Sequence, residues 1–457
     1  MHGSTVVVTL ALVIAITLAP AGAQELNRPV KLTLEESREC ANSSLMYATY
    51  LKPTGLEMVR LGGYSPDNGV TWETWADSPA FDANLPHGYR RESFPIFVDW
   101  SNGNIVRVVP SMDTPGLDPN IIEPPVALET YYLRYRVSTD GGRTYLFDDQ
   151  VIQKGHTAEN PFDGVYYGKN GIFMGDVGSQ IIRTRAGKII IPAQACKLGP
   201  DGKLWSPGGG FTYTDVIMVI GTWTEDNRLD WQICRPIEAD PARSTRGMIE
   251  PTVAEMPDGR LLCVMRGSNG GSKDPEYKIP GYRWYSVSED GGYTWTAPEP
   301  WTYDDGQPFH SPSSMSQLLK HSSGRYFWLG NICEDNPRGN DPRYPLVIGE
   351  VNPQTLCLIR ESVLVVDTKR PEESGLNLSH WWAFEDRPTG DIIIAGARYG
   401  PGYTTSTPLA VAGGSGGVEG TGSWPSVGQA ILDRIASVRA SCRTGRPFIS
   451  RGRPNPL

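Results

Sequence analysis

One octapeptide pattern, Ser-x-Asp-x-Gly-x-Thr-Trp/Tyr, occurs three times in this chain and once more in a degraded form. The full copies start at Ser65, Ser138 and Ser288, and the degraded copy starts at Thr224. Successive copies therefore begin 73, 86 and 64 residues apart. Recurrence at such intervals indicates a repeated structural unit. The chain is therefore expected to fold as a repeat architecture.

The residues of this pattern are those of a hairpin turn. An Asp carboxylate accepts hydrogen bonds from nearby backbone N–H groups, Gly takes the position with positive φ, and Trp or Tyr packs beneath the turn. Strand-like runs precede the copies, over residues 131–137, 215–220 and 282–287. We predict that each copy fastens strands within one unit and has no catalytic role.

A second repeat alternates with the first and consists of a polar-Gly turn that leads into an apolar strand. Its glycines are 84, 72, 65 and 66 residues apart, at Gly103, Gly187, Gly259, Gly324 and Gly390. Each unit then holds about four short strands, as a propeller blade does. We predict an all-β fold, a six-bladed β-propeller, over residues 24–403.

The two ends of the chain differ from the repeats. Residues 1–23 resemble a signal peptide, because an apolar run is followed by Ala21-Gly22-Ala23. This leader predicts a secreted or periplasmic protein that does not span a membrane. Residues 404–457 begin Gly-rich, pass through a short helix-like run after Val427 and become Arg-rich. We expect this tail to be poorly ordered.

Charge and cysteine content exclude several classes of partner. The net charge of −9 argues against binding to nucleic acid or to an anionic membrane surface. The seven cysteines show neither a CxxC pair nor the spacing of a metal site. We expect no metal, no cofactor and a monomeric protein.

One segment carries a more specific pattern, Glu250-Pro-Thr-Val-Ala-Glu-Met-Pro-Asp-Gly-Arg-Leu-Leu-Cys-Val-Met-Arg266. A hairpin that turns at Gly259 would place Glu250 and Arg266 side by side, either as site residues or as an ion pair at the rim of a blade. The octapeptide turns are of the kind called Asp boxes. Together with them, this segment resembles the sialidase (exo-α-neuraminidase) family over roughly residues 50–400. The resemblance implies that Glu250 activates the nucleophile and that Arg266 binds the substrate carboxylate.

The same resemblance implies two further arginines. Sialidases use three arginines because sialic acid carries a carboxylate on its anomeric carbon, and planar guanidinium groups bind carboxylates in a bidentate manner. Here Arg91 and Arg343 would join Arg266, with Arg338 as the alternative to Arg343. Arg246 lies close to Glu250 in sequence and would add positive charge.

The remaining family residues are a general acid and a nucleophile. The acid is expected on loop 110–119, where Asp118 fits the family spacing and Asp113 is the alternative. The family's nucleophile is a Tyr at the start of the first strand of the last blade, yet residues 377–386 contain no Tyr. His380 lies there and could act as an acid or a base.

These features predict a secreted sialidase-like glycoside hydrolase that acts on terminal acidic sugars of glycans. The alternatives are a non-catalytic carbohydrate-binding propeller and another carbohydrate-active enzyme, such as a lyase of uronate polysaccharides with Tyr or His as base. Tyr344 and Tyr399 do not fit the expected nucleophile position, which favours the alternatives. The pairing of Glu250 with Arg266 favours an enzyme, because a binding protein needs no activating carboxylate.

Overall fold

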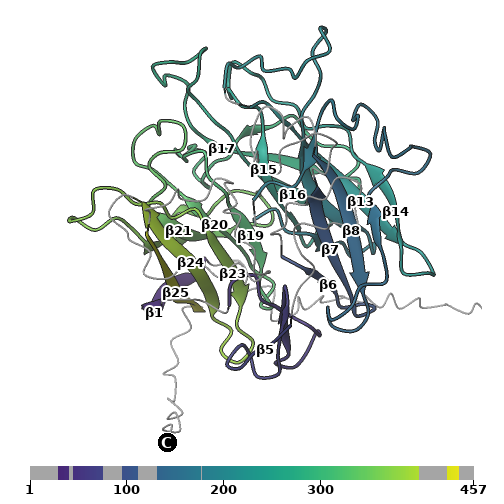
Figure 1. The fold of residues 1–457 in the computed structure, drawn as a ribbon. Helices are drawn as coiled ribbons and strands as arrows, with labels where there is room; N and C mark the ends of the chain where they lie inside the picture. The colour runs from purple at the N-terminus through teal and green to yellow at the C-terminus, as the bar shows by residue number, and fades with distance from the viewer. Residues whose placement is uncertain are drawn as a thin grey trace, which may run out of the picture.

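The computed structural model describes residues 29–40, 45–75, 95–111, 131–176, 178–210, 212–400 and 430–441. Six sheets account for nearly all regular structure in these ranges, and the 3-10 helix η1 (Arg360–Ser362) is the only helical element within them. In the same ranges, no helix is long and apolar enough to cross a bilayer. The predicted all-β, six-bladed propeller is confirmed (Figure 1).

Five blades follow one another along the chain, and each contains consecutive strands. Blade one contains β2 (Thr49–Tyr50), β3 (Met58–Arg60), β4 (Gly63–Ser65) and β5 (Glu73–Thr74). Blade two contains β6 (Phe97–Asp99), β7 (Asn104–Ser111), β8 (Tyr132–Ser138) and β9 (Asp148–Gln150). Blade three contains β10 (Ile172–Phe173), β11 (Ile182–Arg183), β12 (Ile189–Ala195), β13 (Asp215–Trp223) and β14 (Leu229–Ile233). Blade four contains β15 (Ile249–Glu255), β16 (Leu261–Arg266), β17 (Arg283–Ser288) and β18 (Glu299–Pro300). Blade five contains β19 (Gln317–Lys320), β20 (Tyr326–Asn331), β21 (Leu346–Val351) and β22 (Leu364–Asp367).

The sixth blade joins the two ends of the chain. It consists of β23 (Trp381–Glu385), β24 (Ile392–Gly400), β25 (Ala430–Ser441) and the N-terminal β1 (Lys31–Cys40) as its outermost strand. The first and last strands pair antiparallel, with purple β1 against yellow β25 in Figure 1. The ring is therefore closed by hydrogen bonds between segments about four hundred residues apart.

The expected tail needs a correction at residues 430–441. Sequence analysis placed them in a tail with a helix-like run, whereas they form the strand β25 between β1 and β24. Ala436 and Val438 are buried while Arg439 is exposed, which is the alternation of a half-buried strand. A short apolar run fits helix and strand alike, and here pairing decides. The expected signal peptide and the rest of the tail lie outside the described residues.

The Asp-box turns fasten the third strand of a blade to the fourth, as predicted. In the copy that links β17 to β18, Ser288 Oγ accepts from the Gly292 N–H at 2.9 Å and donates to Asp290 Oδ1 at 2.9 Å. Asp290 Oδ2 accepts from Thr294 Oγ1 at 2.6 Å, and the Trp295 indole donates to Gly292 O at 2.9 Å. The turn chemistry is satisfied within the motif itself.

Apolar side chains hold neighbouring blades together. The largest cluster draws on blades two, three and four, and contains Val137, Ile190, Val219 and Met265 among others. A second cluster joins blade five to blade six, including residues of the N-terminal strand β1. Because each blade packs on the next, strand ends on one face of the ring converge, and this convergence positions the candidate site.

Candidate functional site

Glu250 and Arg266 meet at the open end of the fourth blade, as the predicted hairpin requires. Arg266 Nη1 donates to Glu250 Oε1, and the two side chains are only 8% and 12% exposed. The strand bulges at Glu250, whose φ of 48° is rare for a residue other than Gly. Its backbone N–H donates to Gln194 Oε1 at 2.7 Å. Strained backbone of this kind is concentrated at functional sites.

A close approach from blade three helps to fix Glu250. A Cβ added to Gly175 would lie 2.6 Å from Glu250 Cα, so only Gly fits there. This packing leaves Glu250 Oε2 buried, with no hydrogen-bond partner among the described residues. One oxygen of the carboxylate is thus engaged by Arg266, and the other remains available as an acceptor.

Ser313 connects Arg266 to Arg343. Arg266 Nε donates to Ser313 Oγ at 2.6 Å, and Arg343 Nη2 donates to the Ser313 carbonyl at 3.0 Å. Arg266 Nη2 also donates to Asn340 Oδ1 at 3.1 Å. The structure therefore brings together two of the three predicted carboxylate-binding arginines, from different blades, around one serine.

Tyr399 joins this cluster from the sixth blade. Its Oη lies 2.9 Å from Ser379 Oγ, and Ser379 Oγ accepts from Arg343 Nη1 at 2.8 Å. Burial raises the pKa of the Tyr399 phenol, and the nearby Arg343 guanidinium offsets only part of that rise. Tyr399 is thus a protonated phenol at neutral pH beside the two arginines.

Asp176 supplies a second carboxylate. It lies on the segment between β10 and β11, directly after Gly175, and its charge acts on both Arg266 and Tyr399. Burial lowers the pKa of Arg266, and the carboxylates of Glu250 and Asp176 oppose that change. The described cluster therefore combines two arginines, two carboxylates and one phenol.

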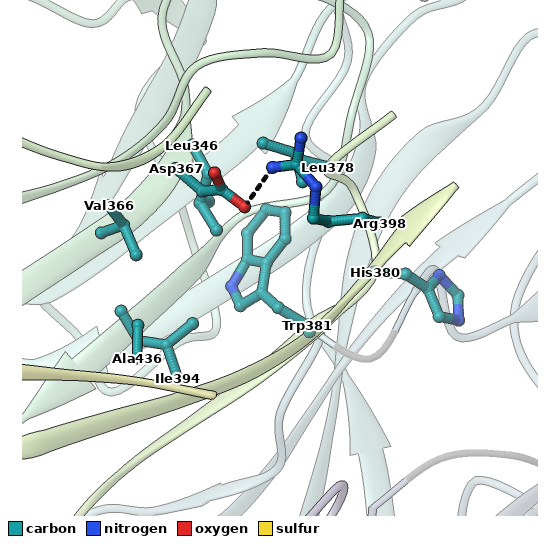
Figure 2. A pocket seen from close by; sticks show the side chains of 10 residues that line it. Leu346, Val366, Asp367, Leu378, His380, Trp381, Ile394, Arg398 and Ala436 are labelled. Atoms are coloured by element: carbon teal, nitrogen blue, oxygen red, sulfur yellow. Dashed lines mark hydrogen bonds and ion pairs between the residues drawn. The ribbon is translucent and has the colours of Figure 1, made fainter. Parts of the chain in front are cut away.

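His380 lies next to Tyr399, with the two rings edge to face and their centroids 6.5 Å apart. It also lines a small cavity between blades five and six, with Trp381 and Arg398 (Figure 2). The cavity measures about 20 Å³, room for roughly one water molecule. In it, Arg398 Nη1 donates to Asp367 Oδ2 at 2.6 Å, which anchors the end of β24 that carries Tyr399.

Arg246 contacts a loop of blade three, and three other predicted site residues lie outside the described residues. Arg246 Nη2 donates to Thr212 Oγ1 at 2.7 Å, which ties it to the loop before β13. Arg91, Asp113 and Asp118 lie outside the described residues. Their roles stay predictions. Within the part of the chain that the structure describes, no group of three or more His, Cys, Asp or Glu side chains could hold a metal ion.

A family model described as a BNR repeat-like domain matches residues 90–357, which is more than half of the chain. The chain belongs to the BNR repeat-like domain family. The match covers the Asp-box copies that start at Ser138, Thr224 and Ser288, and the hairpin from Glu250 to Arg266. The predicted membership of an Asp-box (BNR) propeller family is thereby confirmed.

Solved structures with a similar fold include a protein of unknown function, sialidases and an arabinofuranosidase. A protein of unknown function from Dyadobacter fermentans matches at 15% identity and a TM-score of 0.51, over 89% of this chain and 99% of that chain. A Hadza microbial sialidase matches at 19% identity and a TM-score of 0.43, over 73% of this chain and 56% of that chain. An α-L-arabinofuranosidase of Fusarium graminearum matches at 14% identity and a TM-score of 0.43, over 86% of this chain and 92% of that chain. No curated protein matches the chain. Because the Dyadobacter fermentans protein is only 15% identical to this chain, that similarity shows the fold alone.

From the sequence of this BNR propeller, Tyr399 was set aside as a nucleophile and Asp176 was missed. Tyr399 ends the second strand of blade six, as Arg266 ends the second strand of blade four. That equivalence was available in the sequence, since a polar-Gly turn precedes both strands, at Gly259 and Gly390. Asp176 gave no such signal, because its place depends on how blade three packs against Glu250.

Proposed function

We propose that this protein is a glycoside hydrolase that acts on terminal acidic sugars of glycans, with sialic acid as the leading candidate. One observation carries the proposal: Arg266 and Arg343 converge on Ser313 beside the phenol of Tyr399. Two guanidinium groups that approach from neighbouring blades suit a single carboxylate on the substrate. The predicted Arg91 would complete the set.

The hydrogen-bond partners of Arg343 also favour an acidic ligand. Arg266 is already engaged by Glu250, but Arg343 donates only to neutral oxygens of Ser313 and Ser379 in the hydrogen bonds described above. Its Nε is buried with no partner among the described residues. A substrate carboxylate would give Arg343 a charged acceptor in addition to these neutral ones.

Tyr399 is our candidate nucleophile. A neutral phenol avoids the repulsion that a carboxylate nucleophile would meet from the substrate carboxylate. Its raised pKa means that a base must take the phenol proton as the oxygen attacks the anomeric carbon. Asp176 or Glu250 Oε2 would accept this proton, and Asp118 would protonate the departing oxygen. Export is part of the proposal, because residues 1–23 resemble a signal peptide and the substrates would be extracellular glycans.

A second candidate is a lyase of uronate polysaccharides. The packing of His380 against Tyr399 favours it, because such a lyase uses Tyr or His as base beside a bound carboxylate. The two candidates differ in their products. A hydrolase releases a saturated sugar, whereas a lyase leaves an unsaturated uronate that absorbs ultraviolet light.

The test is release of 4-methylumbelliferone from its α-N-acetylneuraminic acid conjugate, beside the β-glucuronide and α-L-arabinofuranoside conjugates as matched substrates. Glu250→Gln, Tyr399→Phe and Asp118→Ala would be assayed with the unaltered protein. Hydrolysis of the acidic conjugates alone, lost in Glu250→Gln and Tyr399→Phe, supports the proposal. Absence of release from folded protein, with ultraviolet absorbance developing on a uronate polysaccharide, supports the lyase instead.

A further inference from the structure

Arg283 is a fully buried arginine on the strand next to Arg266. It begins β17 and pairs in register with Arg266 on β16, and its side chain is 0% exposed. Nη1 donates to the Ser314 carbonyl at 2.9 Å, and Nη2 donates to Ser311 Oγ at 2.9 Å. Nε is buried with no hydrogen-bond partner among the described residues, and Arg283 forms no ion pair with any carboxylate there.

A buried guanidinium without a carboxylate is unfavourable for folding. Removing such a charge from water is costly, and well-packed apolar side chains often replace buried charges without loss of stability. Burial lowers the pKa of Arg283 to about 9, so the side chain is still charged at neutral pH. The specific contribution of this arginine is therefore its hydrogen bonding to Ser311 and Ser314.

The hydrogen bonds of Arg283 end on the segment that holds the site arginines. Ser311 and Ser314 contact Arg283, and Ser313 between them contacts Arg266 and Arg343. Segment 311–314 therefore contacts all three arginines. The planar fork of a guanidinium fixes the positions of both acceptors at once.

We infer that Arg283 is a positioning residue that holds segment 311–314 so that Arg266 and Arg343 meet the substrate carboxylate together. The inference rests on the proposed function for its substrate, but its structural part stands on the contacts of Arg283 alone. A shift of Ser313 would displace Arg266 through its hydroxyl and Arg343 through its carbonyl. Such displacements would weaken binding of the substrate carboxylate while leaving the groups that carry out the reaction in place.

The test compares Arg283→Met and Arg283→Lys with Arg107→Met, which removes a buried arginine of blade two. Arg283→Met should raise KM for the acidic conjugate about tenfold or more while kcat changes less than about threefold. The melting temperature should stay the same or rise, and Arg283→Lys should recover part of the KM. An unchanged KM in Arg283→Met, or a loss of activity that merely parallels a loss of stability, overturns the inference.

Hydrogen exchange separates this inference from the proposed function. Amide exchange in a peptide covering residues 311–316 should accelerate in Arg283→Met and remain unchanged in Arg107→Met, whether or not the protein hydrolyses any conjugate. Unaltered exchange in that peptide overturns the inference even in an active enzyme. Should Arg283→Met not fold, Ser311→Ala removes only the hydroxyl that accepts from Arg283, and the same two readouts decide.

Discussion

Tyr399 Oη lies 2.9 Å from Ser379 Oγ, so the C-terminal end of strand β24 is joined to the segment that precedes β23. Ser379 also accepts from Arg343, which makes the phenol and that guanidinium neighbours through one hydroxyl. The family resemblance places a nucleophilic Tyr on the first strand of the last blade. Here the phenol comes from the second strand and reaches the same cluster.

Tyr399→Phe should abolish most of the activity while the fold is kept. The variant removes the oxygen that would attack and the hydrogen bond to Ser379, so a loss of at least about a hundredfold in kcat is expected. Tyr285→Phe, on β17, is the matched control and should retain activity. Steady-state kinetics on the sialic acid conjugate measures both. A Tyr399→Phe enzyme with near-normal kcat would assign the chemistry elsewhere.

Glu250→Ala should destabilise the protein through its partner. It leaves Arg266 buried without its main carboxylate, which typically costs about 3–5 kcal/mol. The double variant Glu250→Leu with Arg266→Met should recover most of that loss, because it removes both charges. Urea denaturation of the three proteins tests this. A single Glu250→Ala cost below about 1 kcal/mol would show that the pair is solvated in solution.

Asp215 should make stability depend on pH in an unusual direction. Burial raises the pKa of its carboxyl to about 6, although Lys197 at 3.1 Å opposes the rise. The folded protein then binds more protons than the unfolded chain between about pH 4 and pH 6, so this group lowers stability as pH rises through that window. Asp215→Asn should remove the fall and add at most about 3 kcal/mol at pH 7.

Denaturation at pH 4.5 and pH 7 measures this effect, with Glu238→Gln as the control for an exposed partner of Lys197. Equal pH dependence in Asp215→Asn and the unaltered protein would contradict the account.

Replacing the Asp by Ala should destabilise the protein more in a full Asp-box copy than in the degraded one. Asp290 accepts hydrogen bonds from four groups of its turn. Its counterpart in the degraded copy, Asp226, accepts from Thr224 Oγ1 and pairs with Arg228 at the surface. Asp290→Ala should cost about 1–2 kcal/mol, and Asp226→Ala about 0.5 kcal/mol or less. Equal losses in urea denaturation would show that the turns do not owe their stability to these bonds.

Local chemistry explains which parts of the fold could be predicted. Asp290, Gly292 and Thr294 complete their turn within one octapeptide, so the sequence pattern carries the structure. The hairpin from Glu250 to Arg266 is equally local, since a single turn at Gly259 sets its geometry. Both were predictable from spacing alone.

Long-range contacts explain what could not be predicted. The strand character of residues 430–441 depends on pairing with β1, and a short apolar run alone fits a helix as well. Asp176 belongs to the cluster because blade three packs on Glu250 through Gly175. Neither relationship leaves a periodic signal in the sequence.

Ring closure by β25 can be tested by truncation. Ending the chain at residue 429 removes Ala436 and Val438 from the core of blade six and leaves β1 without its partner. This variant should lose cooperative unfolding or become insoluble. Ending the chain at residue 441 should leave the melting temperature within a few degrees of the full chain. Equal behaviour of the two truncations would show that β25 does not close the ring.

Recognition of a carboxylate by Arg266 and Arg343 is the central claim, and calorimetry tests it directly. N-acetylneuraminic acid and its methyl ester would be titrated into the unaltered protein and into Arg343→Met. The account predicts that the acid binds at least about tenfold more tightly than the ester, and that Arg343→Met removes this difference. Equal affinity of the unaltered protein for acid and ester, or binding of neither, would contradict it.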